Sequence, residues 1–246
     1  MLLKEIYDYI DEIAPFSLQE EWDNSGLQVG SFNQAVHRVL VALDATKETV
    51  LEAKEKQCDL VITHHPFLFH AQKQFVNENP AFLAAKYGIS LISAHTSFDV
   101  ATGGVQDVLA KQIGLQNVRV ADDGLLRLGT VQKQTAKEFA KIVKEQLHAT
   151  VGVSLGEKPI QTVALCSGAG ADLWEEALLC GADAFLTGEM KHHEVLDANA
   201  KGLSTIVAGH FETEIFAMQV LQNRLQEKFK SLSFCFSDAS SPIQYI

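Results

Sequence analysis

The stretch Cys58-Asp-Leu-Val-Ile-Thr63-His-His-Pro66 shows the pattern that the rest of the chain repeats. Its apolar run is short and rich in β-branched residues, and polar side chains follow it at once, which is typical of a buried strand. Helical patterns lie on either side, at residues 46–57 and at residues 80–87, where Gly88 ends the second helix. Strands that alternate with helices in this way predict parallel pairing with right-handed crossovers.

The same alternation continues along the whole chain and predicts an α/β fold with mostly parallel sheets flanked by helices. We expect strands at residues 38–44, 59–63, 89–94, 162–166, 184–187 and 203–208, and within residues 125–156 one strand on each side of a helix at residues 135–148. We expect helices at residues 2–13, 46–57, 80–87, 103–113, 135–148, 172–179, 192–200 and 212–229.

An internal repeat lies beneath this alternation. Residues 52–63 align with residues 176–187, and residues 85–95 align with residues 200–210 after small gaps. We therefore expect two similar α/β lobes from a duplication, at about residues 1–120 and 121–246, within a single unit. Chance similarity between two strand–helix units is the alternative. Residues 115–160 leave little room for a further inserted domain.

Composition limits the partners. Of the 246 residues, 20 are Lys or Arg and 31 are Asp or Glu, so the net charge is −11. No dense basic run is present, which makes nucleic-acid binding an unfavoured function. No apolar stretch approaches the roughly 18 to 20 residues that cross a bilayer, and the N-terminal stretch lacks a signal-peptide core. These two features predict a cytoplasmic location. The four cysteines are widely spaced without a Cys-x-x-Cys pair, so we expect neither a disulfide framework nor a thiolate zinc site.

Histidines and carboxylates gather where the predicted strands end. Ligands of open α/β sheets bind at the carboxyl ends of the strands, so these residues are candidate metal ligands. Each residue alone is more often structural, but the combination is difficult to explain by packing. The candidates are His64 and His65, Asp99 with His95, Glu189 with the pair His192-His193, and His210 with Glu214.

The spacing favours two metal ions. Adjacent residues of an extended segment point in opposite directions, so His64 and His65 would serve two ions unless the chain bends at Pro66. His210 and Glu214 have the i, i+4 spacing that places both on one face of a helix. Close cations require a bridging carboxylate between them, and Asp99 is the best candidate for it. Imidazole with carboxylate favours zinc, iron, manganese or nickel and does not choose among them.

Two close cations activate a water molecule and stabilise a displacement, which indicates a hydrolase. His95 and Glu189 are candidates for proton transfer or for orienting the ligands, and the two roles are equally compatible with the sequence. The segment Trp22-Asp-Asn-Ser-Gly-Leu-Gln-Val-Gly30 is interpreted as a turn that enters a strand, with phosphate contact by its glycines as the less favoured alternative.

Five motifs together resemble the GTP cyclohydrolase 1 type 2 homologues, also called the Nif-three-like dinuclear metal proteins. They are Trp22–Gly30, Thr63-His-His-Pro66, Ser93-Ala-His-Thr-Ser-Phe-Asp99, Thr187-Gly-Glu189 and Gly209-His-Phe-Glu-Thr-Glu214. The resemblance implies two α/β lobes, a two-metal centre and a homohexamer built as a trimer of dimers. It also implies metal ligands at His64, His65, Asp99, His210 and Glu214.

The family name implies hydrolytic opening of the imidazole ring of GTP with loss of formate, or action on a related nucleotide or phosphoester. Two other functions stay open on the sequence: a metal carrier or inserter without turnover, and an interaction protein whose metals are structural. Structural zinc sites are usually closed by four protein ligands per ion. Five ligands for two ions leave open positions, which favours the hydrolase or the carrier.

Overall fold

A computed structural model of the chain describes residues 1–121 and 124–243, which form two compact units. The first unit contains residues 1–104 and 217–240, and the second contains residues 105–216 with 241–243. The sequence predicts this boundary near residue 120, with the whole C-terminal half in the second lobe. The difference arises because β11 (Ser233–Phe236) pairs in parallel with β2 (Arg38–Ala42), a long-range pairing that returns the chain to the first sheet.

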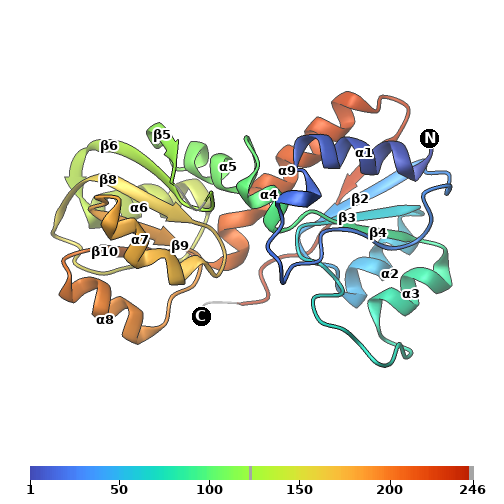
Figure 1. Ribbon diagram of the computed structural model, residues 1–246, viewed down its shortest axis with the longest axis horizontal. Coiled ribbons are helices and arrows are strands. Elements are labelled where there is room, and N and C mark those ends of the chain that lie inside the picture. Colours follow the sequence, from blue (N-terminus) through green and yellow to red (C-terminus); the bar gives the residue numbers. More distant parts are fainter. Residues whose placement is uncertain (122–123, 244–246) are drawn as a thin grey trace. The chain divides into compact units, whose positions relative to one another are not determined.

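The first unit is a five-stranded sheet with helices on both faces (Figure 1). Its strand order is β1-β4-β3-β2-β11, with β1 antiparallel to β4 and the other pairs parallel. Helices α2 and α3 cover one face, while α1 covers the other together with the later part of α9. The elements are α1 (Leu3–Ile13), η1 (Phe16–Leu18), β1 (Gly26–Val29), β2, α2 (Lys47–Glu55), β3 (Leu60–Thr63), α3 (Pro80–Tyr87), β4 (Ser90–Ser93), α4 (Thr96–Val100), most of α9 (His210–Lys228) and β11.

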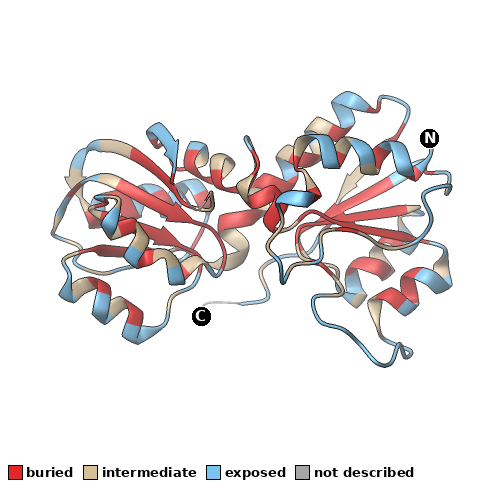
Figure 2. Cartoon of the chain, viewed as in Figure 1, coloured by how far each residue is buried: buried red, intermediate tan, exposed pale blue. Residues whose placement is uncertain are grey.

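Local sequence signals explain the elements of this unit. Every residue of β3 and β4 is buried, as expected for parallel strands that are covered on both faces (Figure 2). The helix α3 begins at Pro80. The side chain of the preceding residue, Asn79, accepts a hydrogen bond from the Phe82 amide and caps the helix. The helix ends at Gly88, whose φ of +69° is a left-handed conformation that glycine adopts without strain.

The second unit contains a six-stranded sheet of order β5-β6-β8-β9-β10-β7. The central strands β8, β9 and β10 are parallel, whereas β5, β6 and β7 pair antiparallel. The sheet therefore has parallel strands at its centre and antiparallel strands at both edges, and β5 and β6 pair antiparallel because they follow one another without a crossover helix. The elements are α5 (Val105–Gln112), β5 (Gln116–Val120), β6 (Arg127–Thr135), α6 (Ala136–Leu147), β7 (Gly152–Val153), β8 (Pro159–Cys166), η2 (Gly170–Leu173), α7 (Trp174–Leu179), β9 (Ala184–Thr187), α8 (His192–Ala200), β10 (Ser204–Val207) and the start of α9.

The strands of the second unit separate two layers of apolar side chains. Val163 and Leu165 of β8 belong to a core formed with α5 and α6. Their neighbours Ala164 and Cys166 belong to a core formed with α7 and α8. Because successive strand residues point to opposite faces, β8 supports helices on both sides.

The two units share one topology at their centres, as the internal repeat predicts. The parallel order β2-β3-β4 of the first unit corresponds to β8-β9-β10 of the second, each with an antiparallel strand beside its third member. The aligned segments place β3 on β9 and β4 on β10. None of the four cysteines, all of which lie in the described part of the chain, forms a disulfide bond. Among the described residues, no helix has both the length and the apolar character needed to cross a membrane.

Candidate metal centre

Polar residues of the first unit gather at the carboxyl edge of its parallel strands. Asp44 follows β2, His64 and His65 follow β3, and His95 follows β4. The three imidazole rings are mutual neighbours, with centroid distances of 5.0 Å from His64 to His65, 5.0 Å from His64 to His95 and 5.5 Å from His65 to His95. One ring nitrogen from each of the three lies within 4.8 Å of the others, which is close enough to share an ion.

The backbone bends directly after β3. The amides of both His64 and His65 donate to the carbonyl of Leu43, at 3.1 and 3.0 Å. Two consecutive amides that share one acceptor cannot belong to an extended strand, in which they point in opposite directions. The bend therefore brings the two rings to the same side, which is the alternative that the sequence analysis left open.

Each of the three histidines is held through Nδ1. His64 Nδ1 donates to the Ala94 carbonyl at 2.9 Å, a bond that fixes its tautomer. The Nδ1 atoms of the other two bind carboxylates, His65 to Asp44 at 2.7 Å and His95 to Asp23 at 2.9 Å. Metal-binding histidines typically donate the second ring N–H to a carboxylate or a carbonyl, which leaves Nε2 as the ligand atom.

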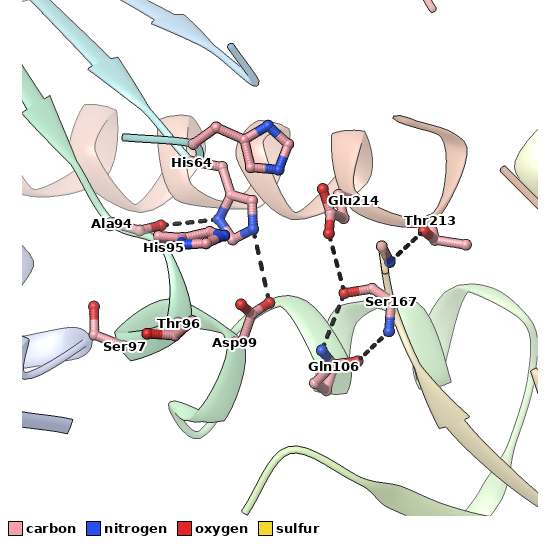
Figure 3. Close-up of polar contacts among 12 residues, drawn as sticks. His64, Ala94, His95, Thr96, Ser97, Asp99, Gln106, Ser167, Thr213 and Glu214 are labelled. Carbon is pink, nitrogen blue, oxygen red and sulfur yellow. Dashed lines mark hydrogen bonds and ion pairs between the residues drawn. The ribbon is translucent and has the colours of Figure 1, made fainter. Parts of the chain in front are cut away.

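Asp99 lies on α4, the short helix that follows His95. Its amide donates to the His95 carbonyl at 3.0 Å, which closes the first turn of this helix. Asp99 is buried, and its Oδ1 atom lies 3.7 Å from His64 Nε2 (Figure 3). The Nδ1 bond to Ala94 thus turns Nε2 of His64 toward a carboxylate that could bind the same ion.

Asp23 fastens the turn that precedes β1 to this cluster. Its side chain is fully buried and accepts hydrogen bonds from His95 Nδ1 and from the amide and hydroxyl of Thr96. Burial raises the pKa of Asp23, but the bonds from His95 and Thr96 outweigh it and hold that pKa well below its usual range. The neighbouring Ser25 hydroxyl accepts from the His95 amide at 3.0 Å. The Asp23 carboxylate is therefore charged when it orients His95.

The second unit presents a comparable arrangement at the carboxyl edge of β8, β9 and β10. His210 opens α9 after β10, and its Nδ1 bonds Oε1 of Glu189, which follows β9, at 2.8 Å. Its Nε2 lies 3.2 Å from Oε2 of Glu214, one turn further along α9. His210 and Glu214 thus share a helix face, as their spacing predicts, and Glu189 orients the imidazole.

Glu214 is fixed from the side of β8. Ser167 follows this strand, and its hydroxyl lies 3.5 Å from Glu214 Oε1 (Figure 3). Gln106 of α5 donates from Nε2 to the same hydroxyl at 3.0 Å and accepts from the Ser167 amide at 2.9 Å. Gly168 lies so close that a Cβ atom there would approach Glu214 Oε1 to 2.2 Å and His210 Nε2 to 3.1 Å. Only glycine therefore leaves this carboxylate in place.

The donor chemistry of both units fits transition-metal ions. Imidazole and carboxylate ligands suit zinc, iron, manganese and nickel, whereas magnesium and calcium prefer oxygen alone. In four histidines the Nδ1 atom is bonded to an oxygen, and these are His64, His65, His95 and His210. A second, independent observation also fits a metal site. Because Gly168 has no side chain, the backbone leaves room for the Glu214 carboxylate, and we call this space the Gly168 cradle.

The structure brings together most of the residues that the sequence singled out. His64, His65, His95 and Asp99 meet in the first unit, and Glu189, His210 and Glu214 meet in the second. His192 and His193 lie exposed at the start of α8, and His70 lies exposed in the loop after β3.

Several supporting residues were missed in the sequence. Asp44 had a usable signal, because it also follows a predicted strand. Asp23 lies in the segment that was interpreted as a simple turn, and the structure shows that this turn holds His95. Ser167 also follows a predicted strand, whereas Gln106 carries no local signal, because its role depends on a contact with a distant segment.

Comparison with known proteins gives a consistent result. The family described as Duf34/NIF3 (NGG1p interacting factor 3) matches residues 1–242. A Clostridium perfringens protein named GTP cyclohydrolase 1 type 2 homolog is 31% identical over 100% of both chains. A Helicobacter pylori protein named GTP cyclohydrolase 1 type 2 is 32% identical over 87% of each. The crystal structure of a hypothetical Staphylococcus aureus protein superimposes with a TM-score of 0.92 and 28% identity, covering 100% of this chain and 99% of that one.

Proposed function

Because the chain belongs to the Duf34/NIF3 family, we propose that it is a dinuclear metal-dependent hydrolase that acts on GTP or a related nucleotide. We propose that two divalent transition-metal ions are bound by His64, His65, Asp99, His210 and Glu214. The observation that carries this proposal is the Nδ1 bonding of His64, His65 and His210, which leaves Nε2 of each ring available as a ligand atom. The names of relatives, including the Helicobacter pylori protein, support the reaction.

The proposed roles of the side chains follow from their contacts. A pair of ions would supply Lewis-acid activation of water and of the group under attack. His95 is the proposed proton-transfer residue, because Asp23 orients its ring beside those of His64 and His65. Glu189 is a positioning residue, since its bond at 2.8 Å sets the orientation of His210.

The experiment that tests this function measures formate release from GTP. Protein purified without chelators should release formate, chelated protein should not, and reloading with one of the four candidate metals should restore the activity. Formate release that persists after complete metal removal would contradict the proposal. Two bound metals without release from GTP would discard the named reaction and favour other phosphoesters or metal transfer.

A His95→Gln variant separates proton transfer from metal binding. It should retain its metals and lose about 100-fold or more in kcat, since general acid–base catalysis contributes roughly that much. His192→Gln is the matched control, because His192 is an exposed histidine at the start of α8. Equal kcat values for the two variants would remove His95 from the mechanism.

The homohexamer and the cytoplasmic location that the resemblance and the composition suggest also belong to this proposal. Light scattering on the purified protein should give the mass of six chains. A stable monomer with full metal content and activity would show that the assembly is not required for the function.

A further inference from the structure

Three exposed or partly exposed rings stand together in the first unit. Trp22 and Phe69 lie 5.5 Å apart between ring centroids, and His95 lies 5.9 Å from Trp22 and 6.0 Å from Phe69. We call Trp22, Phe69 and His95 the aromatic platform. The exposed fraction is 56% for Trp22 and 40% for Phe69, so these two rings are not part of the apolar core.

The platform adjoins the histidine cluster through a shared ring. The His95 ring neighbours those of Trp22 and Phe69, and its centroid also lies 5.0 Å from that of His64. A flat molecule that rests on Trp22 and Phe69 would therefore lie beside His64, one of the proposed metal ligands.

The backbone segments that carry the two rings are held in place. The Gln28 side-chain carbonyl accepts hydrogen bonds from the amides of Phe67 and Leu68, at 2.7 and 3.1 Å. Asn24 donates from Nδ2 to the Leu68 carbonyl at 2.8 Å. Three hydrogen bonds from Asn24 and Gln28 thus hold the loop at the two residues that precede Phe69. A braced pair of exposed rings is organised before any ligand binds.

We propose that Trp22 and Phe69 bind the planar heteroaromatic ring of the substrate, one of them stacked on its face and the other, tilted by 49° from the first, against its edge. This inference rests on the proposed hydrolase function and narrows it to substrates that contain such a ring, rather than to phosphoesters in general. Every nucleobase has a π-face that stacks on aromatic side chains. The net charge of −11 disfavours affinity that relies on phosphate groups alone, which favours a contribution from ring stacking.

The chain permits a direct optical test, because it contains only two tryptophans. Trp174 is buried, with an exposed fraction of 8%, and a Trp174→Phe variant leaves Trp22 as the single emitter. Metal-depleted protein of this variant is titrated with guanosine, with GTP and with inorganic tripolyphosphate. Guanosine and GTP should quench Trp22 emission with saturation, and tripolyphosphate should not.

Two further variants test the second ring. In the Trp174→Phe background, Phe69→Leu should weaken the apparent affinity for guanosine by about five- to 150-fold, the range for loss of one stacking partner. Phe75→Leu is the matched control, since Phe75 lies in the same loop with an exposed fraction of 46%. This control should bind guanosine as the parent does.

The outcomes separate this inference from the proposed function. Saturable quenching by guanosine without GTP turnover would support the platform and contradict the proposed action on GTP. GTP turnover with an unchanged KM in Trp22→Leu and Phe69→Leu would leave the hydrolase standing and overturn the platform. Emission that responds to protein concentration and not to guanosine would show that a second copy of the chain covers these rings, which also overturns the inference.

Discussion

Gly168→Ala tests the fixed position of the Glu214 carboxylate. The added Cβ would lie 2.2 Å from Glu214 Oε1, whereas ordinary contact begins at about 3.4 Å, so the carboxylate has to move by about 1.2 Å. It would then leave His210 Nε2, from which Oε2 of Glu214 is now 3.2 Å away. Displacement of a proposed ligand should weaken metal affinity by at least the roughly 10- to 100-fold found when supporting residues are changed.

The backbone at Gly168 requires a matched control. Its φ is +58°, so alanine there also costs about 1 to 2 kcal/mol in backbone strain. Gly181→Ala imposes the same kind of strain in the second unit, at φ +84°, but its Cβ meets nothing within 4 Å. Both variants should lose stability, and only Gly168→Ala should lose metal affinity.

Isothermal titration with zinc, together with thermal unfolding of the metal-free proteins, separates the two effects. Equal metal affinity in Gly168→Ala and Gly181→Ala would refute the claim that the absence of a side chain at Gly168 keeps the Glu214 carboxylate in its ligand position. Unchanged metal affinity in Gly168→Ala with an unchanged melting temperature would also show that the local structure accommodates the methyl group without displacing Glu214.

Two other predictions concern residues that orient the histidines. Glu189→Leu removes the acceptor of His210 Nδ1 and should weaken zinc binding by about 10- to 100-fold, with Glu189→Gln retaining more of the affinity; equal affinities by titration would contradict this role. Asp23→Asn should lower the free energy of unfolding by about 1 to 3 kcal/mol at neutral pH. Because the folded-state pKa of Asp23 is depressed, its stabilisation is present above the unfolded pKa and is lost as the pH falls below about 4, so the wild-type and variant curves should converge in acid. Denaturant unfolding at several pH values checks this, and a gap that widens in acid would reverse the sign.

Local signals were sufficient to predict most of the elements. The strand β9 and the helices α3 and α8 have the bounds that the sequence predicts. Each is delimited within a few residues of its own chain, by Pro80 and Gly88 in the case of α3. The proposed ligands were also identifiable, because the ends of predicted parallel strands lie at one edge of a sheet.

Features that depend on distant contacts could not be predicted. The return of β11 to the first sheet requires the pairing of Cys235 with Leu40. The bend after β3 requires the Leu43 carbonyl, which comes from the neighbouring strand segment. The role of Asp23 requires a hydrogen bond to His95 across 72 positions of sequence. In each case the sequence contains the residue and the fold supplies its partner.

The central claim is that this chain binds two metal ions through a set of ligands that includes a bridging carboxylate at Asp99. Elemental analysis of protein purified without chelators, compared with Asp99→Asn prepared in the same way, tests it most directly. The account predicts about two transition-metal ions per chain in the parent and the loss of at least one in the variant, with the fold retained by circular dichroism. Full retention of both ions in Asp99→Asn, or a folded parent that neither contains metal nor takes it up, would contradict the account.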